Sequence, residues 1–271
     1  MDVLSEIGRW KPLAAFASLS VLLLLEWWVP FRISLQPKLR HVVTNCVIAG
    51  GNAAIVNVLF GGVLLAWSHR ADREGWGLLH YVGLGPIADI VAAVVVLDLV
   101  FYAVHWANHQ VPFLWRFHHA HHSDLDLDAT SALRFHLGEV LISTGIKAIS
   151  IPVLGISPAG LLIFEMALQA AAQFQHSNIR LPEGGETWVR RVIVTPHMHW
   201  LHHSHCPQDH NANYGTILSM WDRMLGTYSM RIPRNEIRIG LDEYPLPKDV
   251  GLFSFYLMPF GRARRSGRDG L

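Results

Sequence analysis

The sequence predicts an all-α integral-membrane protein with about four to five membrane helices, including a helical hairpin, and a histidine-rich helical cap on the cytosolic side. Three observations support this fold class. Of the 271 residues, 51% are hydrophobic and 16% are charged, with a mean hydropathy of +0.26, which is more typical of membrane proteins than of soluble ones. Several apolar stretches reach the about 20 residues that a spanning helix needs. Finally, 14 of the 17 histidines lie between His105 and His210.

The charge balance and the cysteine content exclude several classes of protein. The formal net charge is only +1, whereas nucleic-acid-binding proteins usually carry a strong basic excess. Cys46 and Cys206 lie far apart, which excludes a disulfide framework, a CxxC zinc site and a cysteine-ligated iron–sulfur cluster. The N-terminus shows no clear cleavable signal, so we interpret its apolar run as a retained anchor.

The first two apolar stretches predict membrane anchors. Residues 13–29 end at the pair Trp27 and Trp28, the kind of side chain that lies at a membrane interface. Residues 42–67 contain three asparagines and four glycines, which favour packing between helices over contact with lipid.

The next two stretches lead to the histidines. Residues 87–107 carry Asp98 in their interior and end among His105 and His109. Residues 137–175 are long enough to cross the bilayer and return, and the segment SIPVLGISPAG interrupts them with prolines and glycines. We therefore expect a helical hairpin here. Residues 250–260 are interpreted as a segment that lies at the membrane interface, and the tail RARRSGRDG is basic.

The membrane topology follows from the positions of the histidines. If they build one site, they must lie on one side of the membrane, and the two crossings of a hairpin satisfy that condition. The arginines that follow His176 indicate the cytoplasm by the excess of Lys and Arg found in cytoplasmic segments. The N-terminus would then lie outside.

Three segments place histidines at helical spacings of i, i+3 and i+4, which share one face of a helix. They are HWANH with His105 and His109, HHAHH with His118, His121 and His122, and HWLHH with His199, His202 and His203. Neutral imidazole is a good ligand for iron, copper, nickel or zinc. Eight imidazoles exceed the four that one tetrahedral zinc ion accepts, so the pattern predicts a pair of metal ions.

Other polar residues carry weaker signals. Asp98 lies two helical turns before His105, where it orients a ligand or forms an interhelical hydrogen bond. Glu139 and Glu165 are ionisable groups in apolar surroundings, which makes them functional candidates. His119 lies off the face of its triplet, and His41 and His210 are interpreted as loop or interface residues.

These segments, in this order and separated by an apolar hairpin, resemble the fatty acid hydroxylase/sterol desaturase superfamily, in particular its bacterial members. The stretches FQHSN and NANYGTILSMWDRMLGTY are similar to that family as well. The resemblance covers about residues 85 to 230, and the first 85 residues are only compatible with it. It divides the chain into membrane anchor helices (1–85), a hydroxylase-like catalytic domain (86–230) and a C-terminal interfacial segment with a basic tail (231–271).

The resemblance implies a non-haem di-iron centre that activates O2 to hydroxylate or desaturate a lipid. The metal ligands that it implies are His105, His109, His118, His121, His122, His176, His199, His202 and His203. His136, His119 and Asp98 are further candidates, as ligands or as partners of ligands. Some eukaryotic members carry an additional histidine where this chain has Ala172.

The expected partners are a membrane lipid, O2 and a separate electron donor such as a ferredoxin, a cytochrome or a reductase. A separate donor is expected because the sequence has no dinucleotide fingerprint, no CxxC motif and no haem-binding segment of its own. Two alternatives stay open, a zinc-dependent membrane lipid hydrolase and a metal-binding membrane protein without catalysis. The sequence does not identify the lipid, nor does it separate hydroxylation from desaturation.

Overall fold

The computed structural model describes residues 3–261, and in that range the chain is helical without a β-strand. The longer helices are α1 (Val3–Trp28), α2 (Lys38–Phe60), α3 (Val63–Glu74), α5 (Pro86–Gln110), α6 (Pro112–His122), α7 (Leu137–Leu154) and α8 (Pro158–His176). The shorter ones are α4 (Leu78–Val82), η1 (Ala129–Leu133), α9 (Glu183–Val189), α10 (Pro196–His202), α11 (Pro207–His210), α12 (Met220–Met224), η2 (Arg234–Glu236), α13 (Leu252–Leu257) and η3 (Met258–Phe260).

Four of the described helices are long and apolar enough to cross a membrane. They are α1 from Trp10 onward, α2, α5 and α7. The predicted membrane-helical fold class is therefore confirmed. The hairpin is also present, because α7 ends at Leu154 before the C-cap Gly155, which has a φ of 73°, and α8 starts at Pro158 after the N-cap Ser157.

The apolar stretch of residues 42–67 contains the candidate span α2 but is longer than that helix. The segment divides into α2 and α3 at Gly61 and Gly62. Gly62 adopts a φ of 73°, a left-handed conformation that glycine reaches without steric cost and that ends a helix. The apolar pattern continues across this break, so hydropathy alone could not reveal it.

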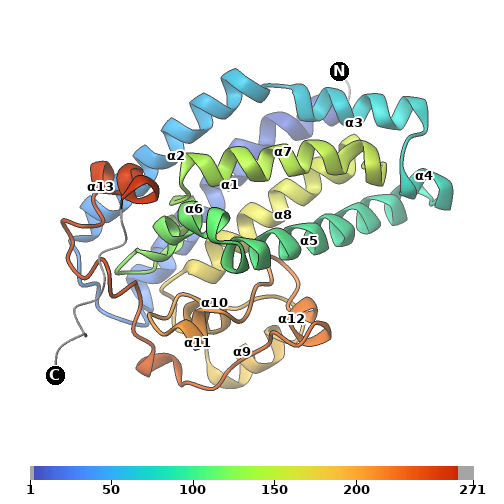
Figure 1. Cartoon of the computed structure of the whole chain (residues 1–271). Coiled ribbons are helices and arrows are strands. Elements are labelled where there is room, and N and C mark those ends of the chain that lie inside the picture. The colour runs from blue at the N-terminus through green and yellow to red at the C-terminus, as the bar shows by residue number, and fades with distance from the viewer. Residues whose placement is uncertain (1–2, 262–271) are drawn as a thin grey trace.

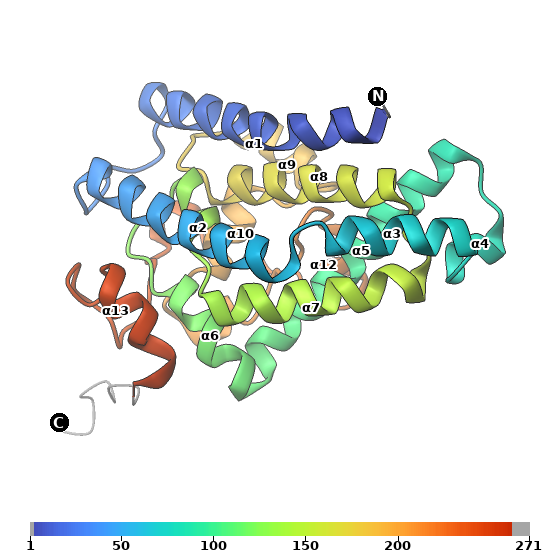
Figure 2. The same cartoon turned by 90° about the horizontal axis from the view of Figure 1, so that it is seen from above.

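Helix α8 lies at the centre of the bundle and packs against α1, α3 and α5. Figure 2 shows α1, α8, α2 with α3, and α7 side by side. A buried apolar cluster that includes Ala93 and Leu97 of α5, Ile151 of α7 and Phe164 of α8 holds these helices together. The bundle thereby fixes the ends of α5 and α8, where the first histidine pair and His176 lie.

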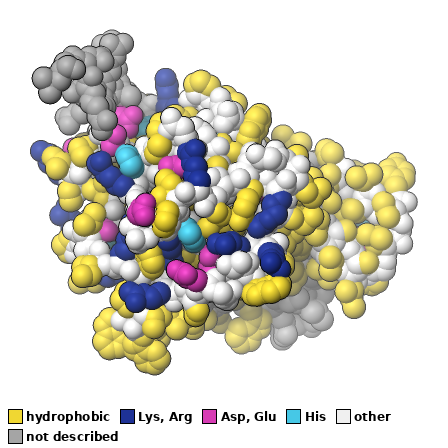
Figure 3. Space-filling view, turned by 90° about the horizontal axis from the view of Figure 1, so that it is seen from below, with side chains coloured by type: hydrophobic (Ala, Val, Ile, Leu, Met, Phe, Trp, Pro, Cys, Tyr) yellow, Lys and Arg dark blue, Asp and Glu magenta, His cyan; other side chains and the backbone are white. Residues whose placement is uncertain are grey.

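The chain after α8 folds into short helices and loops that form a polar cap beneath the bundle (Figure 1). Figure 3 shows Lys and Arg, Asp and Glu, and His side chains mixed over this cap, whereas the adjoining part of the surface is largely hydrophobic. In the C-terminal segment, Phe253 and Phe260 are exposed and Phe255 is buried. The basic tail from residue 262 lies outside the described residues.

Candidate metal centre

The first two histidine segments meet because α6 begins almost where α5 ends. His105 and His109 lie in the last turns of α5, and Pro112 starts α6 at the first helical position, where its missing N–H costs nothing. Helix α6 then carries HHAHH back beside α5. This sharp reversal brings His118 to a ring-centroid distance of 5.1 Å from His105.

The structure brings all nine predicted histidines together in two adjoining groups. The first group consists of His105, His109, His118, His122 and His202. The second group consists of His121, His176, His199 and His203. In each group, one nitrogen from every ring lies within 4.8 Å of the others, so each can surround one ion. Neighbouring residues of one helix are divided between the groups, because i and i+1 face different directions.

The backbone and one carboxylate orient five of these rings from outside. In each of the five, Nδ1–H donates to a fixed acceptor and leaves Nε2 facing inward, an arrangement typical of metal-bound histidine. The pairs are His105 with Tyr214 O at 2.9 Å, His118 with Glu139 Oε1 at 2.8 Å, His121 with Arg134 O at 3.1 Å, His176 with Ala172 O at 2.7 Å and His202 with Ala212 O at 2.8 Å.

These orientations create a conflict that a bound cation would relieve. His121 and His176 each donate from Nδ1, and a neutral imidazole has only one N–H. Their Nε2 lone pairs nevertheless face each other at 3.1 Å. Nitrogens at about 2.0–2.1 Å from one metal ion lie about 3.0–3.4 Å apart, so the spacing fits two ligands of the same ion.

Unpartnered nitrogen atoms give the same indication. Both ring nitrogens of His109 and Nε2 of His202 are buried and have no hydrogen-bond partner among the described residues. Buried polar atoms are rarely left unsatisfied unless a ligand or an ion completes them. The residues present therefore fit a metal centre.

Burial keeps the histidines of α6 and of the cap neutral. Removal from water lowers the pKa values of His121, His122, His199, His202 and His203 well below the ordinary value for histidine, and the neighbouring imidazoles lower them further. A ring that does not bind a proton at neutral pH offers its lone pair to a metal ion.

The three further candidates lie outside both groups. Asp98 is fully buried, but its carboxylate accepts hydrogen bonds from Thr216, Ile217, Leu218 and Trp221 of the cap and contacts no histidine. It ties α5 to the cap.

His136 and His119 have structural contacts. His136 accepts a hydrogen bond from the backbone N–H of Gly138 and so caps α7. His119 bonds the carbonyl oxygen of Trp115 and the hydroxyl of Tyr244. Neither side chain joins the metal-binding groups.

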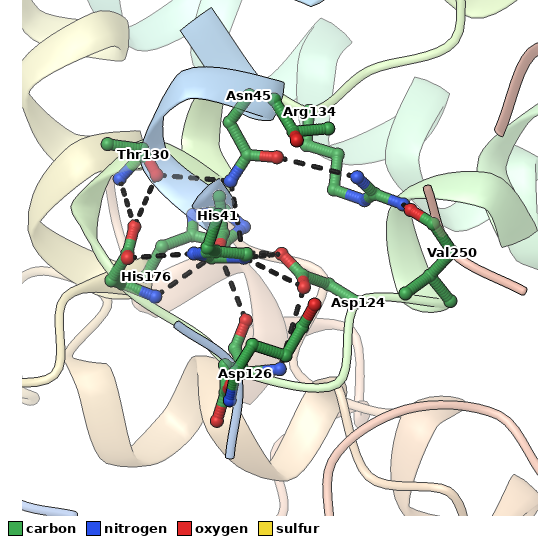
Figure 4. A network of polar contacts seen from close by, with 12 residues as sticks. His41, Asn45, Asp124, Asp126, Thr130, Arg134, His176 and Val250 are labelled. Carbon is green, nitrogen blue, oxygen red and sulfur yellow. Dashed lines mark hydrogen bonds and ion pairs between the residues drawn. The ribbon is translucent and has the colours of Figure 1, made fainter. Parts of the chain in front are cut away.

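His41, which the sequence analysis set aside, is buried between two carboxylates (Figure 4). Its Nε2 lies 2.9 Å from both carboxylate oxygens of Asp124, and its Nδ1 lies 2.9 Å from Asp128. Carboxylates only accept hydrogen bonds, so both ring nitrogens donate and the ring is a cation. Burial alone would raise the pKa of Asp124, but the facing charge of His41 lowers it.

This charged network extends to both sides of the candidate centre. Lys38 bridges Asp128 at 2.8 Å and Glu26 at 2.6 Å. Glu26 in turn accepts hydrogen bonds from the backbone N–H groups of Ala129 and Asn178. The network therefore fixes the segments that follow HHAHH and His176 to the ends of α1 and α2. No local pattern could reveal it, because its partners are far apart in the sequence.

His210 is the second residue that sequence reasoning missed. Its ring stacks on Trp115 with centroids 5.4 Å apart and lies 6.0 Å from the rings of His109 and His122. Together, Trp115 and His210 cover the outer side of the first group.

The comparisons with known proteins agree with the predicted resemblance. An ornithine lipid hydroxylase of Rhizobium tropici is 31% identical over 145 residues, which cover 53% of this chain and 43% of that protein. An alkylglycerol monooxygenase of Xenopus tropicalis is 28% identical, and the match covers 80% of this chain and 46% of that protein. Human cholesterol 25-hydroxylase is 26% identical over 76% of each chain.

The matched region thus spans less than half of the bacterial hydroxylase and of the frog monooxygenase. No solved structure matches this chain. The sequence model of the fatty acid hydroxylase family matches residues 90–227, about half of the chain and a range that contains all nine clustered histidines. The chain belongs to the fatty acid hydroxylase family.

Proposed function

We propose that this protein is an integral-membrane oxygenase that uses two non-haem iron ions, O2 and external electrons to hydroxylate or desaturate a C–H bond of a lipid. The observation that carries the proposal is the set of nine imidazoles in two adjoining groups, seven of them buried and two partly buried, with no carboxylate in either group among the described residues. The relatives support the lipid part, because their names state ornithine lipid, alkylglycerol and cholesterol as what they act on.

The number of ligands favours iron over zinc. The first group offers five imidazoles and the second four, whereas a catalytic zinc ion uses three protein ligands and leaves one position open. A zinc hydrolase would also need a carboxylate base beside the metal. Among the described residues, the only carboxylate that bonds a histidine of the groups is Glu139, and it lies behind His118 at Nδ1.

When bound, a pair of iron ions supplies the activation of O2 that cleavage of an unactivated C–H bond requires. The chain supplies the geometry. Carbonyl oxygens of Tyr214 and Ala212 hold His105 and His202 in a fixed orientation, and the ring of Trp115 shields the outer side of His109. Excluding water in this way protects a reactive centre from side reactions.

We further propose that the centre lies on the cytoplasmic side and receives electrons from a separate carrier. All nine histidines lie at one end of the bundle or in the cap. Exposed arginines on the cap, such as Arg180, Arg231 and Arg238, favour a cytoplasmic location. The same charges would attract an acidic electron carrier.

The test is O2-dependent modification of membrane lipids. Cells that express the protein are grown under ¹⁸O2, and their lipid extracts are compared by mass spectrometry with those of cells expressing His121→Ala and His202→Ala, which remove one ligand from each group. Incorporation of ¹⁸O into a lipid, or loss of two hydrogens, is expected only with the intact protein. Lipid cleavage without dependence on O2 would contradict the proposal and favour the zinc hydrolase.

A further inference from the structure

A cavity of about 570 Å³ lies between α6, the loop around α11 and the segment of residues 241–244. His109, Trp115 and His210 are among the residues that line it. The cavity therefore lies next to the first histidine group, on the side that Trp115 and His210 cover. Its volume falls in the range of about 300–1,000 Å³ that small-ligand sites occupy.

The cavity lies at the end of a candidate membrane span. Its lining includes His109, in the last turn of the candidate span α5, and Pro112, at the start of α6. Phe113 and Phe260, which are chain neighbours of lining residues, are 60% and 73% exposed. Exposed aromatic side chains at the end of a span are typical of a membrane interface, so lipid can approach the cavity from the bilayer.

The lining carries charges of both signs. Arg116 is exposed, and it forms no hydrogen bond or ion pair with any side chain among the described residues. Glu243 is half-buried and likewise has no such partner there. Asp242, in contrast, lies 3.5 Å from Arg238. Arg116 and Glu243 thus remain available to a ligand that brings one anionic and one cationic group.

The wall that carries Glu243 is held in place by its neighbour. The hydroxyl of Tyr244 lies 3.2 Å from Nε2 of His119, and Nδ1 of His119 is fixed by the carbonyl oxygen of Trp115 at 3.1 Å. This link ties residues 241–244 to α6. The two charged side chains are therefore presented from connected elements rather than from independent loops.

We propose that this cavity binds the headgroup of a zwitterionic lipid, with its phosphate or carboxylate at Arg116 and its ammonium group at Glu243. The assignment rests on the proposed function only in taking this lipid as the substrate. Binding itself requires no turnover, so it can be tested separately from oxygenase activity.

The experiment measures lipid binding to the full chain in a neutral maltoside detergent by native mass spectrometry. The probes are dioctanoyl phosphatidylethanolamine, which is zwitterionic, phosphatidylglycerol, which is anionic, and diacylglycerol, which is uncharged. Phosphatidylethanolamine should bind about tenfold more tightly than phosphatidylglycerol, because only its ammonium group forms a charge-assisted contact with Glu243.

Two variants separate the contacts. Glu243→Gln should remove the preference for phosphatidylethanolamine over phosphatidylglycerol. Arg116→Gln should weaken the binding of both phospholipids by about tenfold and leave the binding of diacylglycerol unchanged. Arg40→Gln and Glu236→Gln are matched controls, because both residues are exposed and lie outside the lining.

Equal binding of the three probes, or equal effects of the cavity and control variants, would overturn the assignment. Glycerophosphoethanolamine without acyl chains serves as a further probe, and binding as tight as that of the lipid would show that the ligand is a soluble zwitterion instead. If the protein binds the zwitterionic lipid as expected but incorporates no oxygen into it, the cavity assignment stands and the proposed oxygenase function fails.

Discussion

The carboxylate of Glu139 provides the sharpest prediction, because it contacts only one of the two histidine groups. Its Oε1 accepts hydrogen bonds from Nδ1–H of His118 at 2.8 Å and from Asn108 at 3.1 Å, and the residue is 7% exposed. In Glu139→Gln the amide oxygen can still accept, but the contact loses its charge. Changes to such outer partners of metal ligands weaken metal binding by about 10–100-fold, or about 1.4–2.7 kcal/mol.

We therefore expect Glu139→Gln to weaken the binding of one metal ion by that factor and to leave the affinity for the second ion within about twofold of its original value. The assay is iron content after equilibrium dialysis against a graded series of chelator concentrations. Glu165→Gln is the control, because Glu165 is a carboxylate that pairs with Lys11 and Lys147 and contacts no histidine. If both ions bound equally more weakly, or if neither affinity changed, the division of the ligands into two groups would be refuted.

Three further predictions concern stability, measured by thermal unfolding in detergent. Asp98→Ala leaves four cap donors without their acceptor and should cost about 3–5 kcal/mol; an unchanged midpoint would contradict its role as a tie between α5 and the cap. His41→Gln leaves Asp124 and Asp128 without their counter-charge and should cost a similar about 3–5 kcal/mol; Arg40→Gln, on the same helix, should change little. The third concerns pH. Burial lowers the pKa values of His122, His199 and His203 in the folded chain, so below about pH 6.5 the unfolded chain binds more protons. The metal-free protein should therefore lose stability as the pH falls from 7 to 5, and a flat profile would contradict neutral, buried rings.

The sequence was sufficient for features that repeat locally. Spacings of i, i+3 and i+4 placed the histidines of α6 and α10 on shared faces, and Gly155 with Pro158 marked the turn of the hairpin. Asp98 was expected to orient a histidine or to form a hydrogen bond between helices. The structure shows the hydrogen bond between helices, because Trp221 of α12 donates to the carboxylate of Asp98 on α5, and it adds backbone donors of the cap such as Ile217.

Features that depend on long-range contacts could not be predicted. His41 lies outside the histidine-rich region, and its partners Asp124 and Asp128 are more than 80 positions away in the chain. The approach of His210 to Trp115 depends on how a loop closes over α6. Neither contact has a periodic signature, so only the folded chain reveals it.

The two-group arrangement also explains why the clustered histidines tolerate burial. Unpaired polar atoms in a dry interior are costly, and among the nine residues several ring nitrogens have no partner in the described chain. An ion bound by the first group would satisfy Nε2 of His202 and one ring nitrogen of His109. The metal ions are therefore expected to stabilise the fold as well as to carry the chemistry.

The most direct test of this account is the metal content of the protein purified in mild detergent from cells grown with ⁵⁷Fe, with elemental analysis and Mössbauer spectroscopy of the same sample. We predict about two iron ions per chain, as two groups of histidines require, and the loss of iron in His121→Ala and His202→Ala. One zinc ion per chain without iron would contradict the di-iron oxygenase and would favour a zinc hydrolase instead.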